Sequence, residues 1–261
     1  MLPFHRRLAQ LGLAEIGRYG FVLAGGYAIS ANGMGDRPSQ DVDLFTDRAD
    51  AVDFWAAADL LQATYRSHGL DITVARTAPT FGDYLVTDPV TGDSSSIQLG
   101  HDYRAFPPAT IDIGPVLDPR DAVAGKMAAL WSRGEARDYI DIDTVIASGR
   151  FTRDEVLAIG DRIEVQPLDR TMLAHRFREV ARHDEATFVR YTVGATDRGA
   201  IIERFAQWAD QIDPPDSHGD TGLRSAPSPV WESVDRAAGT DPRIRQIPTN
   251  GQPGPGLNLQ P

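Results

Sequence analysis

Two periods of apolar residues alternate along the N-terminal part of the chain. Apolar residues recur at helical spacing over 4–19 and 53–67, which predicts two amphipathic helices. The apolar run at 21–24 predicts a short buried strand, and the polar–apolar alternation at 41–45 predicts a half-buried one. Further elements are predicted as a helix at 27–32, strands at 70–76, 81–87 and 94–99, and a hairpin turn at Gly92-Asp93. Residues 1–115 therefore predict a mixed α/β domain around one sheet.

The pattern becomes helical after residue 115. Asp118 followed by Pro119 is typical of a helix start, because aspartate caps free backbone N–H groups and proline fits the first helical position. The apolar spacing then predicts helices at 119–132, 137–148, 152–162, 171–182, 185–193 and 197–212. Residues 116–212 are therefore predicted to form a helical bundle, so the predicted fold class is α+β.

The C-terminal end differs in composition from the rest of the chain. Residues 213–261 contain nine of the 18 prolines and few apolar residues besides Trp231. A segment that buries little apolar surface cannot offset the entropy lost on ordering. We therefore expect this segment to be largely disordered.

Composition and charge narrow the classes of function. The chain contains no cysteine, which excludes disulfides, zinc–thiolate sites and a cysteine nucleophile. Its formal net charge of −11 counts against a broad duplex-binding surface, which would need basic patches. No apolar run approaches the roughly 20 residues of a membrane span, and the N-terminus lacks the apolar core of a signal peptide. We therefore expect a cytoplasmic protein with no membrane partner, acting on a small substrate or on the end of an RNA.

Two glycines and two aspartates give the main chemical signal. Gly25-Gly26 separates a predicted strand from a predicted helix, where a phosphate can approach the backbone and the free N–H groups of the helix start. Asp41 and Asp43 are two residues apart on a predicted strand, so both side chains point to the same face. Such a pair repels itself unless a cation lies between the carboxylates, and Mg²⁺ binds carboxylates together with substrate phosphates. The pattern predicts a triphosphate at the glycines, a metal at the aspartates, and attack at the α-phosphate with release of pyrophosphate.

Two blocks of sequence resemble a known family. The first block is Gly-Gly-Tyr-Ala at 25–28 followed by Arg-Pro-Ser-Gln-Asp-Val-Asp-Leu at 37–44. The second is Lys-Met-Ala-Ala-Leu at 126–130, then Arg133, then Arg-Asp-Tyr-Ile-Asp at 137–141. The glycine–aspartate pattern resembles the DNA polymerase β-like nucleotidyltransferase superfamily. Both blocks together are similar to its AbiEii-type family, which includes the MenT group of toxins.

The resemblance implies a role for each motif residue. The triphosphate would be bound by Gly25, Gly26, Ser39 and Lys126. The metal would be bound by Asp41 and Asp43. Asp141 and Asp138 would complete the site from the helical half of the chain. The residues themselves leave alternatives open. Lys126 also fits a solvated lysine on an amphipathic helix, and Asp138 fits a carboxylate favoured by a helix N-terminus. Arg37 either binds the nucleotide by neutralising its charge or pairs with an acidic neighbour.

One position departs from the superfamily pattern. Members that use three metal carboxylates place the third on a later strand. Gln98 stands at that position of the predicted strand 94–99, and Asp102 just beyond it is the candidate replacement. Catalysis with two metals is therefore in question.

Three functions follow from these observations. The resemblance implies transfer of a nucleoside monophosphate from an NTP, with Mg²⁺ or Mn²⁺, to the 3′ end of tRNA. The enzyme would be a toxin that a cognate antitoxin protein neutralises. A second possibility keeps the chemistry but modifies a protein or a cationic small molecule such as an aminoglycoside, which an acidic cleft would attract. The third is a degenerate, non-catalytic binding module, which Gln98 supports and Lys126 and Asp141 oppose.

Overall fold

The computed structural model describes residues 1–48, 50–163 and 167–214 of the chain. These residues belong to one compact unit. The division at residue 115 into two domains stays a prediction. The segment 213–261, for which we expect disorder, lies outside the described residues except for positions 213 and 214. No helix in these ranges combines the length and the apolar character that crossing a membrane requires.

One mixed sheet positions the aspartate pair. The strands follow the order β3-β4-β5-β2-β1-β7-β6. Their bounds are Val22–Leu23 for β1, Asp41–Thr46 for β2, Asp71–Ala78 for β3, Phe81–Thr87 for β4, Ser94–His101 for β5, Ala109–Ile111 for β6 and Gly114–Val116 for β7. Strand β2 runs parallel to β5 and β1 parallel to β7, while the other neighbours are antiparallel. The aspartates therefore lie on a strand with hydrogen-bonded neighbours on both sides.

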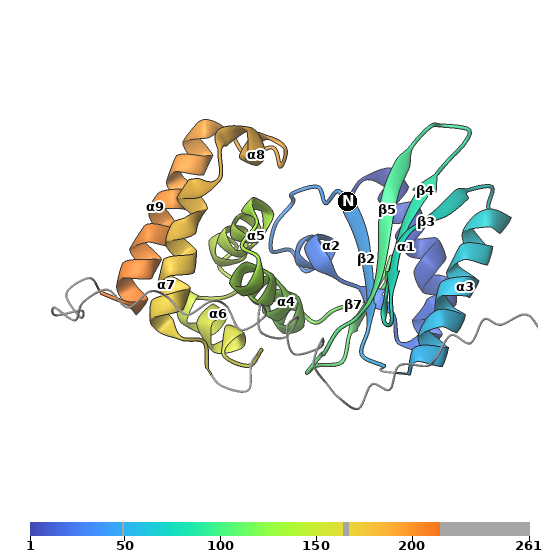
Figure 1. The fold of residues 1–261 in the computed structure, drawn as a ribbon, viewed down its shortest axis with the longest axis horizontal. Coiled ribbons are helices and arrows are strands. Elements are labelled where there is room, and N and C mark those ends of the chain that lie inside the picture. The colour runs from blue at the N-terminus through green and yellow to red at the C-terminus, as the bar shows by residue number, and fades with distance from the viewer. Residues whose placement is uncertain (49, 164–166, 215–261) are drawn as a thin grey trace, which may run out of the picture. The chain divides into compact units, whose positions relative to one another are not determined.

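Helices α1 (Pro3–Ile16) and α3 (Ala51–Ser67) cover one face of this sheet (Figure 1). The face is apolar because Val42 and Leu44 of β2 are fully buried on it. Gly12 of α1 lets the helices approach, since a side chain there would come within 2.9 Å of Leu61. Burial of one face of β2 leaves its other face, with the aspartates, directed away from α1 and α3.

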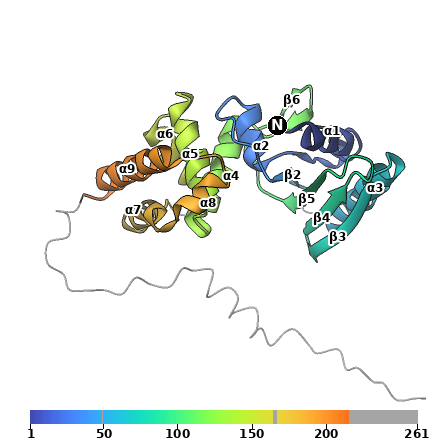
Figure 2. The ribbon, with the colours of Figure 1, turned by 90° about the horizontal axis from the view of Figure 1, so that it is seen from above.

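The opposite face meets helices from both halves of the sequence (Figure 1). Helix α2 (Gly25–Ala31) contacts β2, α4 (Pro119–Ser132) and α5 (Ala136–Ala147). Asp118 caps α4 through the backbone N–H of Arg120, as predicted. The remaining helices are α6 (Arg153–Gly160), α7 (Arg170–Arg178), α8 (Glu185–Val189) and α9 (Ala195–Ile212). Figure 2 shows them gathered around α4 and α5, where aromatic rings of α5, α7 and α9 pack against one another.

The predicted α+β class is confirmed, and the deviations are local. Strands β6 and β7 were not predicted, because each has three residues and β7 contains both glycine and proline. Helix α2 begins at Gly25, two residues before the predicted start. The predicted helix at 171–182 ends at Arg178 and continues as one turn of 3₁₀ helix, Glu179–Arg182. The predicted helix at 185–193 ends at Val189, and the one at 4–19 ends at Ile16 and continues as a 3₁₀ turn, Gly17–Tyr19. Each predicted helix and strand is otherwise present.

Candidate active site

A cavity of about 170 Å³ lies between the aspartate face of β2 and helices α2, α4 and α5. The predicted site residues on its wall are Gly25, Gly26, Arg37, Ser39, Asp41, Asp43 and Lys126. Gln98, Asp102, Arg133 and Arg137 also line it. The two sequence blocks, about a hundred residues apart, thus meet at one cavity. Asp138 and Asp141 do not line the cavity, but they contact side chains that do.

Close packing explains why glycine occupies position 25. Gly25 has φ +58°, and a Cβ atom there would lie 1.7 Å from Oδ2 of Asp43. At Gly26 a Cβ atom would lie 3.1 Å from both Nη2 of Arg37 and Oγ of Ser39. The glycines therefore let the backbone at the start of α2, with its free N–H groups, lie directly against the polar wall. A side chain at position 25 would occupy the place of the Asp43 carboxylate.

The aspartate pair has the geometry and the electrostatics of a cation site. Asp41 and Asp43 point to the same face of β2, and Oγ of Ser39 donates a hydrogen bond to Oδ1 of Asp41 at 2.8 Å. Burial, together with the charge of Asp41, raises the pKa of Asp43 to about 7 against the opposing influence of Lys126. Two carboxylates this unfavourable to ionise together fit a hard divalent cation, which prefers oxygen ligands.

Glutamine, not a carboxylate, stands at the expected position of a third metal ligand, as the sequence indicates. Gln98 of β5 pairs with Asp43 of β2, so both side chains lie on the cavity face. Asp102 lies beyond the end of β5 and lines the same cavity, and burial raises its pKa. Among the described residues, no group of three or more histidine, cysteine, aspartate or glutamate side chains could hold a metal. A cation on the pair would therefore need further oxygen ligands from substrate or water.

Lys126 and Arg37 share one buried carboxylate, that of Asp141. Nζ of Lys126 lies 2.8 Å from Oδ2 of Asp141, and Arg37 donates to both its oxygens at 2.8 and 2.9 Å. The guanidinium of Arg37 also lies 5.1 Å from the ring centroid of Tyr191. Burial opposes ionisation of Asp141, but Lys126 and Arg37 lower its pKa below the ordinary value. Lys126 is thus no solvated lysine, since it is only 7% exposed.

Asp138 makes the contacts of a helix-terminal carboxylate. It accepts two hydrogen bonds of 3.0 Å from Arg133 and one of 3.2 Å from the backbone N–H of Glu135, which completes a capping box at the start of α5. Its distance to Nζ of Lys126 is 3.9 Å. Asp138 is fully buried and does not line the cavity. These contacts match the structural alternative raised above, and its role as a nucleotide ligand stays a prediction.

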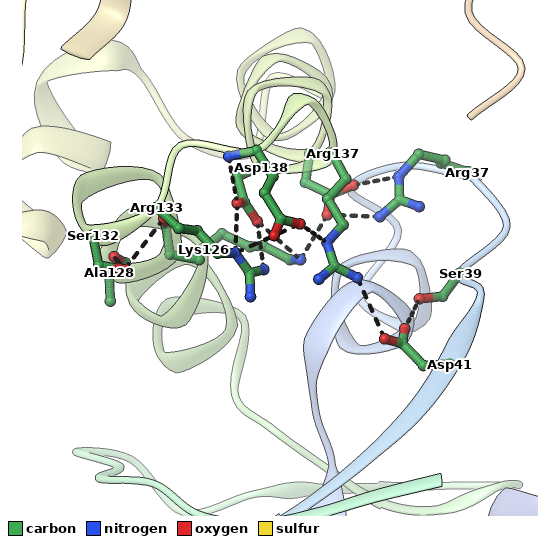
Figure 3. A network of polar contacts seen from close by, with 12 residues as sticks. Arg37, Ser39, Asp41, Lys126, Ala128, Ser132, Arg133, Arg137 and Asp138 are labelled. Atoms are coloured by element: carbon green, nitrogen blue, oxygen red, sulfur yellow. Dashed lines mark hydrogen bonds and ion pairs between the residues drawn. The ribbon is translucent and has the colours of Figure 1, made fainter. Parts of the chain in front are cut away.

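Two arginines on the cavity wall received no role from the sequence. Arg133 is the C-cap of α4, seven residues after Lys126, and Nη1 of Arg137 lies 3.3 Å from Oδ2 of Asp41 (Figure 3). The spacing from Lys126 to Arg133 places both on one helix face, and this signal could have indicated Arg133. The contact of Arg137 joins residues 96 positions apart, and no periodicity predicts it.

The cavity concentrates positive charge in an acidic protein. Arg37, Lys126, Arg133 and Arg137 line it together with three aspartates, whereas the chain carries a net charge of −11. A wall with Lys126, Arg133 and Arg137 on the helical side and paired carboxylates on the strand side suits a polyanion that brings a metal ion with it. A nucleoside triphosphate has this chemistry.

Comparison with known proteins identifies the family of this chain. A family model described as nucleotidyl transferase AbiEii toxin, type IV toxin–antitoxin system, matches residues 8–217. The nucleotidyltransferase toxin MenT4 of Mycobacterium tuberculosis H37Rv has a similar fold, with a TM-score of 0.56, 16% sequence identity, and coverage of 82% of this chain and 85% of that one. JHP933 from Helicobacter pylori aligns with a TM-score of 0.46 and 16% identity over 79% of this chain and 91% of that one. No curated protein matches the chain. The chain belongs to the AbiEii family of nucleotidyltransferase toxins of type IV toxin–antitoxin systems.

Proposed function

We propose that this toxin transfers a nucleoside monophosphate from an NTP, bound with Mg²⁺ or Mn²⁺, to the 3′ end of tRNA, and that a cognate antitoxin protein neutralises it. One observation carries the chemistry: the Asp41–Asp43 pair faces Lys126, Arg133 and Arg137 across a single cavity. This arrangement suits an α-phosphate at the carboxylates and the departing pyrophosphate at the cations.

The residues of β2 and of the start of α2 would bind the metal and the phosphates. Asp41 and Asp43 would hold the cation, which supplies polarisation of the α-phosphate and activation of the attacking hydroxyl. Ser39 fixes the orientation of Asp41 through its 2.8 Å hydrogen bond. The backbone N–H groups at Gly25 and Gly26 would receive phosphate oxygens at the start of α2.

The helical side acts on the leaving group. Lys126 presents a charge that Asp141 holds in place at 2.8 Å, and Arg37 is fixed on the same carboxylate. Both cations would neutralise negative charge that builds up on the pyrophosphate as the acceptor hydroxyl attacks. Asp141 acts through these two residues, so it is a positioning residue.

Two observations support tRNA as the acceptor. A net charge of −11 disfavours extensive contacts with nucleic acid phosphates, and it is compatible with contact limited to an RNA end. The family relation favours a target whose modification harms the cell. The 3′ end of tRNA meets both conditions.

Labelled transfer tests this proposal. The protein is incubated with Mg²⁺, total tRNA and each α-labelled NTP in turn, and we expect label on tRNA with at least one NTP. Replacing Asp41 with asparagine should lower the transfer rate at least ~100-fold, because a direct metal ligand is lost. Asp59→Asn, an exposed aspartate of α3 on the other side of the sheet, is the matched control and should keep the full rate.

The outcomes separate the alternatives. Label on added protein or on an aminoglycoside, with none on tRNA, would reject the tRNA acceptor but keep the chemistry. Failure to label any acceptor, with all four NTPs, would favour a non-catalytic binding module.

A further inference from the structure

Each oxygen of the Asp41 carboxylate already has one side-chain partner in the protein (Figure 3). Its Oδ1 atom accepts the hydrogen bond of Ser39, and its Oδ2 atom lies 3.3 Å from Nη1 of Arg137. Asp43 beside it is the other predicted ligand of the cation. The guanidinium of Arg137 therefore occupies a carboxylate oxygen that a cation on the pair would need.

Arg137 is also the most weakly held of the three arginines on the described cavity wall. Arg37 and Arg133 each donate two hydrogen bonds of 2.8–3.0 Å to one buried aspartate. Arg137 has one contact of 3.3 Å with Asp41, and its Nε lies 2.9 Å from Oε2 of the half-exposed Glu135 without the geometry of a hydrogen bond. A single long hydrogen bond and a half-exposed ion-pair partner hold this guanidinium less tightly than paired hydrogen bonds hold Arg37 and Arg133.

We propose that Arg137 has two binding partners: Asp41 before the metal binds, and the phosphates of the nucleotide afterwards. This inference rests on the proposed function, because it takes the Asp41–Asp43 pair as the metal site. A divalent cation on the pair would repel a guanidinium held a few ångströms away. The same guanidinium lines the cavity, and arginine binds phosphate oxygens through paired N–H groups.

The two positions couple metal binding to nucleotide binding. A cation that arrives alone must displace Arg137 from Asp41, and the displaced charge then keeps only the half-exposed Glu135 as a partner. A cation that arrives with an NTP brings phosphates that accept this charge. Arg137 thereby disfavours the metal alone and favours the metal–nucleotide complex, which is positive coupling between the two ligands.

Replacing Arg137 with glutamine is expected to shift the two affinities in opposite directions. Binding of Mn²⁺ alone, followed by electron paramagnetic resonance without nucleotide, should become roughly fivefold tighter, as expected when a partly exposed competing ion pair is removed. Binding of a non-transferable NTP analogue at saturating Mn²⁺ should become roughly tenfold weaker, because a charged phosphate contact is lost. Arg137→Lys keeps the charge and should restore both affinities in part.

Arg133→Gln is the matched control. It removes the same charge from the same cavity wall, but Arg133 is bound to Asp138 and does not contact Asp41. Its affinity for Mn²⁺ alone should therefore change less than about twofold, since only a longer-range Coulomb effect is removed. Far-ultraviolet circular dichroism establishes that each variant is folded, and Arg137→Lys replaces the glutamine variant if that one is not.

Each other outcome overturns the inference. Unchanged or weaker binding of Mn²⁺ by Arg137→Gln would show that Arg137 does not compete with the cation. If Arg133→Gln tightened Mn²⁺ binding equally, the effect would be one of net charge alone. If Arg137→Gln left binding of the NTP analogue unchanged, Arg137 would not bind the nucleotide phosphates. If Mn²⁺ binding is instead insensitive to Asp41→Asn, the metal site of the proposed function fails as well, which separates the two failures.

Discussion

Replacing Gly25 with alanine is expected to lower the rate of nucleotidyl transfer at least ~100-fold, because a displacement of about 1 Å in a reacting group has effects of this size. The new Cβ atom would lie 1.7 Å from Oδ2 of Asp43, so the carboxylate or the start of α2 must move. The φ angle of +58° adds strain of about 1–2 kcal/mol for any residue with a side chain. Initial rates with α-labelled NTP, together with urea unfolding, measure both consequences.

Gly69→Ala separates the clash from the backbone strain. Gly69 has φ +76° at the end of α3, and a Cβ atom there has no neighbour within 4 Å. This variant should lose about 1 kcal/mol of stability and keep its rate. A Gly25→Ala variant that retains more than a fifth of the wild-type rate would contradict the proposed place of Asp43 in the site.

Replacing Asp141 with asparagine is expected to reduce both stability and activity. The change leaves Arg37 and Lys126, which are almost fully buried, without the carboxylate that compensates their charges. Removing one partner of a buried ion pair costs about 3–5 kcal/mol in the free energy of unfolding. Chemical denaturation measures this loss. The transfer rate should fall as well, because neither cation keeps its position on the cavity wall.

Asp138→Asn provides the comparison within the same helix. Asp138 also binds an arginine through both oxygens, but Arg133 is almost half exposed and can be hydrated when the pair is broken. We expect a loss of about 1–3 kcal/mol in stability and a smaller loss of rate than for Asp141→Asn. Equal losses of rate in both variants would contradict the assignment of Asp141 to positioning Arg37 and Lys126.

The fold was largely predictable because its local signals agree with its tertiary contacts. The alternation in β2 predicted which side chains are buried, and Val42 and Leu44 are fully buried. The cap at Asp118 predicted the start of α4. Strands β6 and β7 were missed, since strands of three residues leave no periodic pattern and β7 depends on pairing with the distant β1.

The sequence indicated several residues that line the candidate site, but not Arg133 or Arg137 and not the contacts between the side chains. The spacing of Asp41 and Asp43 places them on one face without further information. The sequence held no sign that Asp43 packs against Gly25, that Asp141 lies behind the wall, or that Arg137 reaches Asp41. Such contacts join residues of different elements, so they follow from the packing of helices against the sheet.

The position of the transferred label tests the central claim most directly. Purified protein is given tRNA, Mg²⁺ and one NTP that carries its label on either the α- or the γ-phosphate. Nucleotidyl transfer predicts that the α-label passes to RNA while the γ-label is released as pyrophosphate, and that Asp43→Asn abolishes both events. Passage of the γ-label to RNA or protein, or an Asp43→Asn variant as active as the wild type, would contradict the claim that the Asp41–Asp43 pair catalyses transfer of a nucleoside monophosphate.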